Sequence, residues 1–264
     1  MFDGLERADA LLVARGLAES RTRARAAIEA GRVFCDGQPV LKPAQRLHGD
    51  AALAVTPDAE ERYVSRGGLK LAAALEHCAL DVRGAVCLDV GQSTGGFSDC
   101  LLQAGARAVV GVEVGHGQLH SRLVGRDDCI ALEGINARHL DAAALGTHFP
   151  HAGFDLIVCD ASFISLTLLL PRWPALLAAD GDIVALVKPQ FELGPQALGK
   201  GGVVRDERHY ATVETRMRDA AHAAGLDVLA WLDSPISGKG VGHIAGNREF
   251  FIRLRHARGA DTPY

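Results

Sequence analysis

From about residue 64 onward, short apolar runs alternate with helix-like stretches, and this alternation restricts the fold more than any other feature of the chain. The runs are nearly continuous, as in strands that are buried on both faces, and such strands separated by helices build a parallel sheet. We therefore predict a doubly wound, Rossmann-like α/β domain over residues 64–264. Its expected strands are Ala85–Val90, Ala108–Val114, Asp128–Glu133, Phe154–Cys159, Gly181–Lys188, Asp227–Asp233 and Glu249–Leu254, the last of them antiparallel, with helices at Lys70–His77, Phe97–Gln103 and in most other gaps.

A smaller unit precedes this domain. Leu11 to Leu17 give a short helical face, Ser20 is an N-cap for a second helix, and Gly31 ends that helix. A strand at Arg32–Cys35, a tight turn at Asp36-Gly37 and a returning segment indicate a hairpin. We expect a small α+β domain over residues 1–56 and a polar, proline-bearing linker over residues 57–63.

The charge of this smaller unit differs from that of the whole chain. The chain has a net charge of -4, which argues against a uniformly basic nucleic-acid binder, yet Arg21 to Arg46 contain six basic and two acidic residues. This segment is either a solvated helix face or a patch that contacts phosphates. The pattern from Glu6 to Val55 resembles the alpha-L RNA-binding motif of a ribosomal small-subunit protein, pseudouridine synthases and tyrosyl-tRNA synthetases. That resemblance implies RNA contacts by Arg7, Arg21, Arg23, Arg25 and Arg32, and we add Arg66 at the start of the large domain.

A glycine-rich turn, DVGQSTGG, follows the first strand of the large domain. Ligands of open α/β sheets bind at the carboxyl ends of the strands, where glycines let the backbone approach them. A dinucleotide fingerprint requires a glycine where Ser93 stands, so a nicotinamide dehydrogenase fits poorly. Glu113, at the end of the next strand, can accept hydrogen bonds from both hydroxyls of a ribose. The alternative is a tight turn without a ligand; turn, helix and acid together favour an S-adenosylmethionine site.

Two charged residues end buried strands of the same sheet, Asp160 and Lys188. A charge at such a place often marks only the protein surface. Because the carboxyl ends of parallel strands lie at one edge, we expect these two side chains to face one opening.

Seven segments together look like the TlyA family of ribosomal RNA 2′-O-methyltransferases, whose catalytic domain is FtsJ-like: SRGGLKL, DVGQSTGGFSD, VEVGHGQL, FDLIVCDASFIS, LVKPQFELG, GKGGVVRD and GNREFF. The resemblance implies a class I methyltransferase that transfers a methyl group from S-adenosylmethionine to cytidine 2′-hydroxyls of 16S or 23S ribosomal RNA, or of both. By motif, the catalytic set is Lys70, Asp160, Lys188 and Glu249. The cofactor-binding set is Asp89, Gly91, Ser93, Thr94, Gly95, Gly96, Phe97, Glu113, Asn136 and Asp160.

Three departures from the family pattern bear on this site. Gln92 stands where a small residue is usual, and we expect it to crowd the methionine end of the cofactor. Glu113 replaces an aspartate and keeps the carboxylate. The segment Ser234–Asn247 is longer than the usual loop, which makes Glu249 the weakest assignment of the four. The role of Lys188 stays open between a general base and a cation that stabilises a developing alkoxide.

Other classes of site are disfavoured. The six cysteines form no Cys-x-x-Cys pair, so we expect neither a metal site nor a redox motif. The N-terminus lacks a signal-peptide pattern and no apolar run could span a bilayer, which predicts a cytoplasmic protein. The family resemblance implies that its partners are ribosomal RNA and ribosomal subunits. Two alternatives remain: a non-catalytic RNA-binding assembly factor, decided by a methyl-transfer assay, and a membrane-active hemolysin, a name given to some relatives, decided by liposome leakage.

Overall fold

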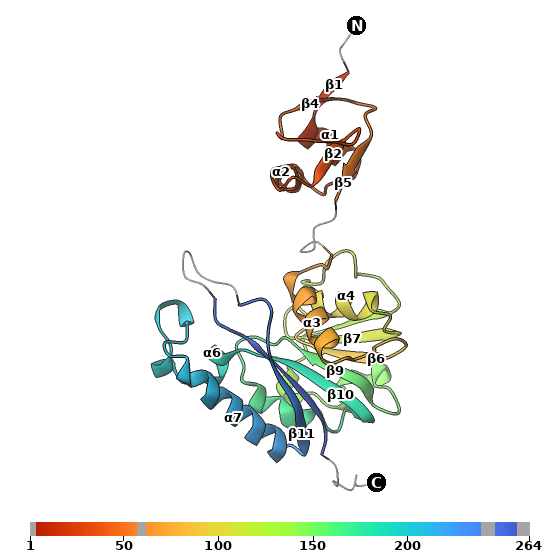
Figure 1. The fold of residues 1–264 in the computed structure, drawn as a ribbon. Coiled ribbons are helices and arrows are strands. Elements are labelled where there is room, and N and C mark those ends of the chain that lie inside the picture. Colours follow the sequence, from red (N-terminus) through yellow and green to blue (C-terminus); the bar gives the residue numbers. More distant parts are fainter. Residues whose placement is uncertain (1–3, 57–61, 239–245, 258–264) are drawn as a thin grey trace. The chain divides into compact units, whose positions relative to one another are not determined.

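The computed structural model describes residues 4–56, 62–238 and 246–257. The chain divides into two compact units, Met1–Arg62 and Tyr63–Tyr264, which are described separately (Figure 1). Most of the expected linker, residues 57–63, lies outside the described residues.

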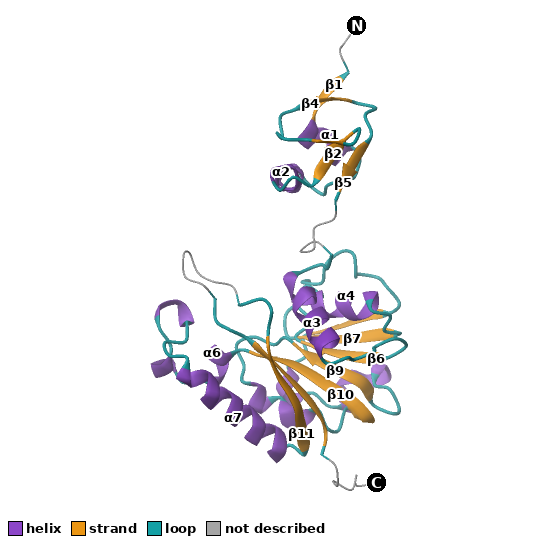
Figure 2. Cartoon of the chain, viewed as in Figure 1, coloured by secondary structure: helices purple, strands orange, loops and turns teal. Residues whose placement is uncertain are grey.

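The N-terminal unit packs two helices against short strands (Figure 2). Ser20 caps the second helix by accepting a hydrogen bond from the Arg23 amide, as predicted. Asp36 and Gly37 both have positive φ, which is the geometry of the expected hairpin turn. The elements are β1 (Leu5–Arg7), α1 (Ala8–Ala14), α2 (Arg21–Glu29), β2 (Val33–Cys35), β3 (Gln38–Pro39), β4 (Arg46–His48) and β5 (Leu53–Val55). The pairing of β1 with β4 was not predicted, because three-residue strands carry no readable periodicity.

The C-terminal unit is built on a seven-stranded sheet in the order β11-β12-β10-β9-β6-β7-β8. The strands from β10 to β8 run parallel, and β12 pairs antiparallel with both β10 and β11, so the expected antiparallel final strand is confirmed. Apolar clusters cover both faces of the sheet. The strands are β6 (Val86–Val90), β7 (Ala108–Glu113), β8 (Cys129–Glu133), β9 (Phe154–Cys159), β10 (Leu177–Val187), β11 (Leu226–Asp233) and β12 (Phe250–His256).

Helices and 3-10 turns connect these strands. Helices were expected in most of the gaps between strands; between β9 and β10 the structure has two 3-10 turns instead, since Pro171 and Pro174 interrupt the helical hydrogen bonding there. The α-helices are α3 (Arg66–His77), α4 (Gly96–Gln103), α5 (Ala142–Leu145), α6 (Pro189–Glu192) and α7 (Arg208–Ala223). The 3-10 turns are η2 (Ala137–His139), η3 (Gly146–His148), η4 (Leu166–Leu168), η5 (Leu170–Arg172), η6 (Pro195–Ala197) and η7 (Lys200–Gly202).

Helix α3 starts one turn earlier than predicted, at Arg66 rather than Lys70. The glycines that weaken its helix propensity are needed for packing, because a side chain at Gly68 would collide with the ring of Tyr63. The early start places Arg66 and Lys70 one turn apart on a helix that borders the sheet edge.

The order of the sheet determines where a ligand can enter. The first strand, β6, lies between β7 and β9, so the connections that leave β6 and β9 diverge to opposite faces of the sheet. An opening forms at such a reversal, outside the carboxyl ends of the strands. The glycine turn follows β6 and Asp160 follows β9, so both border this opening.

Candidate active site

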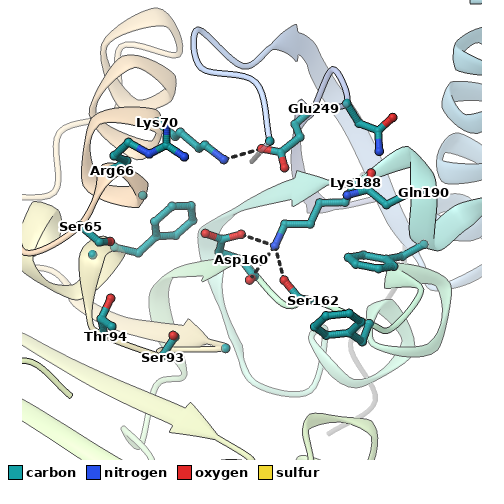
Figure 3. A pocket seen from close by; sticks show the side chains of 18 of the residues that line it. Ser65, Arg66, Lys70, Ser93, Thr94, Asp160, Ser162, Lys188, Gln190 and Glu249 are labelled. Carbon is teal, nitrogen blue, oxygen red and sulfur yellow. Dashed lines mark hydrogen bonds and ion pairs between the residues drawn. The ribbon is translucent and has the colours of Figure 1, made fainter. Parts of the chain in front are cut away.

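A cavity of about 900 Å³ lies at this opening. Its size is within the range of pockets for small molecules. All four residues of the predicted catalytic set line it, although they come from three strand ends and one helix (Figure 3). The lining also includes predicted cofactor residues, namely Asp89, Gly91, Ser93, Thr94, Gly96 and Phe97.

The four candidates form two ion pairs that face the cavity (Figure 3). Lys188 Nζ lies 2.6 Å from Asp160 Oδ1, and Lys70 Nζ lies 2.5 Å from Glu249 Oε2. Glu249 was the weakest assignment from sequence, yet its side chain is 4% exposed and is held directly at the site. Of the long segment before it, residues 239–245 lie outside the described part of the chain.

The amine of Lys188 is surrounded by oxygen atoms. Besides the Asp160 carboxylate, it donates to the Asp160 carbonyl at 3.2 Å and to Ser162 Oγ at 2.7 Å. Two hydrogen bonds and one ion pair thus hold the Lys188 side chain in place.

The glycine turn allows the backbone that follows β6 to lie close to the backbone that follows β9. A Cβ atom at Gly91 would lie 3.0 Å from the backbone of Ala161, and Gly95, the N-cap of α4, has a φ of 88°. The Glu113 carboxylate accepts hydrogen bonds from the amides of Ser93 (3.0 Å) and Gly115 (2.9 Å), so it fixes this turn from the next strand.

Three predicted cofactor residues are not part of the cavity lining. Gly95 is covered by the side chains of Leu119 and Leu123. Glu113 lies beyond the turn, and Asn136 uses its side-chain oxygen to cap η2, accepting from the Arg138 amide.

That Gln92 crowds the cofactor stays a prediction: the residue belongs to the cavity lining, but it is only 4% exposed. Its carboxamide is buried under the turn and donates to Ser98 Oγ at 2.9 Å, with Cys129 Sγ 3.8 Å away. The space that it fills exists because the neighbouring strand has a glycine, Gly111, where any Cβ would overlap the Gln92 side chain. The bulk of Gln92 is thus absorbed by the core.

Asp89 is buried at the floor of the cavity. Ser98 Oγ donates to its Oδ2 at 2.7 Å, whereas Oδ1 has no hydrogen-bond partner among the described residues. Burial, opposed by the Ser98 bond and reinforced by the nearby Asp160 charge, raises the pKa of Asp89 to about 7. A buried acceptor without a partner beside a cavity indicates a place for a ligand donor.

The arginines predicted to contact RNA differ in their surroundings. Arg7 and Arg21 both form ion pairs with the buried Asp9, at 3.0 Å each, so these two are used within the fold. Arg32 reaches the Thr56 carbonyl at 3.4 Å. Arg23 and Arg25 are exposed on α2. In the other unit, Arg66 lines the cavity.

Sequence reasoning missed part of the cavity wall. Ser162 and Phe163 follow β9, and Gln190 and Phe191 follow the end of β10; all four line the cavity. Phe163 is 90% exposed, has a φ of 62°, and its ring lies 5.2 Å from that of Phe191. Their position just after strands that end in predicted site residues is a signal that could have found them.

The described part of the chain has neither a metal-binding group nor a membrane-spanning helix. Residues 4–56, 62–238 and 246–257 contain no group of three or more histidine, cysteine, aspartate or glutamate side chains that could hold a metal ion. None of the helices described is both long and apolar enough to cross a membrane.

Known proteins resemble this chain in both units. A model of FtsJ-like methyltransferases matches residues 63–256, and a model of the S4 domain matches residues 6–53. The 16S/23S rRNA (cytidine-2′-O)-methyltransferase TlyA of Mycobacterium tuberculosis is 44% identical over 94% of this chain and 89% of its own length. Hemolysin A of Brachyspira hyodysenteriae is 36% identical over 76% of this chain and 81% of its own. A solved structure described as a hemolysin from Streptococcus thermophilus superposes with a TM-score of 0.69 and 36% identity, covering 99% of this chain and 90% of that one.

Proposed function

This chain belongs to the FtsJ-like methyltransferases and carries an S4 domain, and from this we propose that it methylates the ribose 2′-hydroxyl of cytidines in ribosomal RNA. The observation that carries the proposal is the pair of lysine–carboxylate contacts facing one cavity beside the glycine turn. Two relatives, which align with 94% and 72% of this chain, are named as rRNA (cytidine-2′-O)-methyltransferases. A ribosomal substrate would place the activity in the cytoplasm.

The residues of the cavity fit S-adenosylmethionine. Gly91 borders the cavity without a side chain, and the free Oδ1 of Asp89 can accept from the ammonium of the amino-acid part. Glu113 lies beyond the glycine turn, outside the cavity lining. Each of its oxygens accepts from one backbone amide and keeps a second lone pair that can accept from a ribose hydroxyl. When bound, the cofactor supplies a methyl group already activated by its sulfonium.

The protein then has to orient the 2′-hydroxyl and promote the loss of its proton. Lys188 is held by three oxygens, so we assign it the role of a cation that stabilises the 2′-oxygen as the proton of the hydroxyl passes to water. To act, the ammonium exchanges one of these contacts, most simply that with Ser162, for the ribose oxygen. Asp160 orients Lys188, and the Lys70–Glu249 pair supports the opposite wall. Alignment of the two reacting groups supplies much of the rate.

The nucleobase needs its own surface, and Phe163 offers one. An exposed aromatic ring held at a cavity rim is a stacking platform for an unstacked base. The S4 domain and the exposed arginines of α2 would bind the RNA backbone without reading its sequence.

The test maps 2′-O-methylated positions in ribosomal RNA from cells with the wild-type protein, with Lys188→Ala and without the protein. We expect one or more cytidines to carry the mark with the wild type alone. In purified form, Lys188→Ala should lower methyl transfer by about 10²–10³-fold while the calorimetric affinity for S-adenosylmethionine stays close to that of the wild type. Lys200→Ala, an exposed lysine outside the cavity lining, is the matched control. An identical methylation map in all three strains would refute the proposal.

A further inference from the structure

Two segments of the cavity wall, far apart in sequence, are joined by a buried glutamate that the proposed chemistry does not use. Glu192, the last residue of α6, is 3% exposed. Its Oε2 accepts from Ser165 Oγ at 2.5 Å and its Oε1 accepts from the Leu166 amide at 2.8 Å. Both oxygens are therefore committed to the connection that follows β9.

Glu192 holds the connection between β9 and β10, which contains three residues of the cavity lining: Asp160, Ser162 and Phe163. It runs from Asp160 through Ser162 and Phe163 to the start of η4. Lys188 fixes its first part by contacting Asp160 and Ser162, and Glu192 fixes its last part at Ser165 and Leu166. The two fixing residues lie four positions apart, on either side of Phe191.

Phe163 lies between these two anchors in a conformation that costs energy. Its φ of 62° is in the left-handed region, which is rare for a residue with a large side chain. Its ring is almost fully exposed, so burial does not stabilise this conformation. A strained residue keeps its geometry when its neighbours on both sides are fixed.

We propose that Glu192 is a positioning residue that holds Phe163 and the adjoining part of the β9–β10 connection in place for the RNA substrate. The inference rests on the proposed function for the identity of that substrate. It assigns Glu192 no contact with RNA or cofactor: its effect passes through the Ser165 and Leu166 contacts to the loop.

Activity measurements separate this role from a general loss of structure. Glu192→Ala should raise the KM for ribosomal RNA or lower kcat/KM on the order of tenfold to a hundredfold, because the base platform is no longer fixed. Affinity for S-adenosylmethionine, measured by calorimetry without RNA, should stay within about threefold, since the glycine turn lies on other strands. Glu76→Ala, an exposed residue of α3, is the matched control. Equal loss of cofactor affinity and RNA turnover would overturn the assignment.

The conservative variant sharpens the test. Glu192→Gln keeps an oxygen for the Leu166 amide, and its amide group can donate to Ser165 Oγ, so it should retain activity within about threefold of wild type. Burial raises the pKa of Glu192, which agrees with a site that tolerates a neutral side chain. A glutamine variant as damaged as the alanine variant would contradict the hydrogen-bonding role.

A double-mutant cycle asks whether Glu192 acts through Phe163. In the Phe163→Ala background, Glu192→Ala should cause little further loss, because the ring that it positions is already absent. If the loss of activity in the double variant equals the product of the losses in the two single variants, Glu192 does not act through Phe163. If Glu192→Ala does not fold, Ser165→Ala, which removes one of the two contacts, takes its place in the same cycle.

Hydrogen exchange tests the inference independently of the substrate. In Glu192→Ala, amides of residues 161–168 should lose protection while those of β9 and β10 keep theirs. Unchanged protection of residues 161–168 would overturn the positioning role even if the wild type methylates ribosomal RNA. Loss of protection in an enzyme that leaves ribosomal RNA unmethylated would instead uphold the role and refute the proposed substrate.

Discussion

Each of the two units of this protein contains an aspartate that is almost completely buried, and the surroundings of these two aspartates are opposite in kind. Asp9 in the N-terminal unit and Asp89 in the C-terminal unit are both 1% exposed. Asp9 is held between Arg7 and Arg21, chiefly by the Arg7 hydrogen bonds, and its pKa falls to about 2. Asp89 has a serine but no cation beside it, and burial raises its pKa to about 7.

The difference in partners shows that Asp9 contributes to the fold of its unit, whereas Asp89 has an oxygen that is available to a ligand. In the N-terminal unit the arginines meet the carboxylate within the fold, so that ion-pair cluster contributes to stability. In the C-terminal unit a carboxylate is left with an unpartnered oxygen at a cavity, which costs stability until a donor arrives. The same type of side chain thus stabilises the fold in one unit and, in the other, is proposed to bind a ligand.

The largest expected effect comes from titrating Asp89. Its folded pKa lies above the unfolded value of about 3.9, so the folded protein binds a proton that the unfolded chain releases, and stability falls as pH rises from about 4 to about 7. Urea denaturation should show the stability of wild type relative to Asp89→Asn falling by roughly 2–3 kcal/mol between pH 5 and pH 8. A difference that does not vary with pH would show that Asp89 is not protonated in the fold.

The second test removes the charge from the other aspartate. Asp9→Asn should destabilise the N-terminal unit by roughly 1–2 kcal/mol, a value reduced because both arginines remain partly solvated. The pH dependence has the opposite sign: the lowered pKa means that the Asp9 contribution is complete above about pH 4 and is lost as pH falls through about 2.

Thermal unfolding and hydrogen exchange of α1 in the full chain measure this destabilisation. Glu29→Gln, an exposed residue of α2, serves as the matched control. Asp9→Asn with the stability of that control would show that the arginine cluster does not stabilise the unit, and the contrast with Asp89 would fail.

The smallest effect is expected for an arginine that Asp9 does not hold. Arg25 is exposed, and its side chain forms no ion pair with the other residues that the structure describes. Arg25→Ala should weaken binding of ribosomal RNA several-fold and reduce the slope of log affinity against log salt by about 1. Filter binding at several salt concentrations measures both quantities.

Arg83→Ala in the C-terminal unit, where Arg83 pairs with Asp81, is the control for that change of charge. An unchanged salt slope for Arg25→Ala would remove α2 from the RNA-binding surface. The next comparison would measure the salt dependence of RNA binding for alanine variants of Arg7 and Arg21, which pair with Asp9, and of the exposed Arg23.

Much of the site could be read from the chain because its signals are local. The alternation of apolar runs predicted the strands, and Asp160 and Lys188 could be placed at one sheet edge because each directly follows a strand. Ser20, Asp36 and Gly37 were read correctly for the same reason, since a cap or a turn depends on neighbouring residues.

Other features depend on residues that are distant in sequence, and only the tertiary structure decided them. Lys70 pairs with Glu249, 179 residues later in the chain, Asp9 forms an ion pair with Arg21, and Gln92 packs into space left by Gly111. The physical reason is that sequence periodicity fixes which elements form and which face is apolar, while a side chain's partner depends on how those elements pack. The residue types of the site were therefore determined by the sequence, and their pairing by the fold.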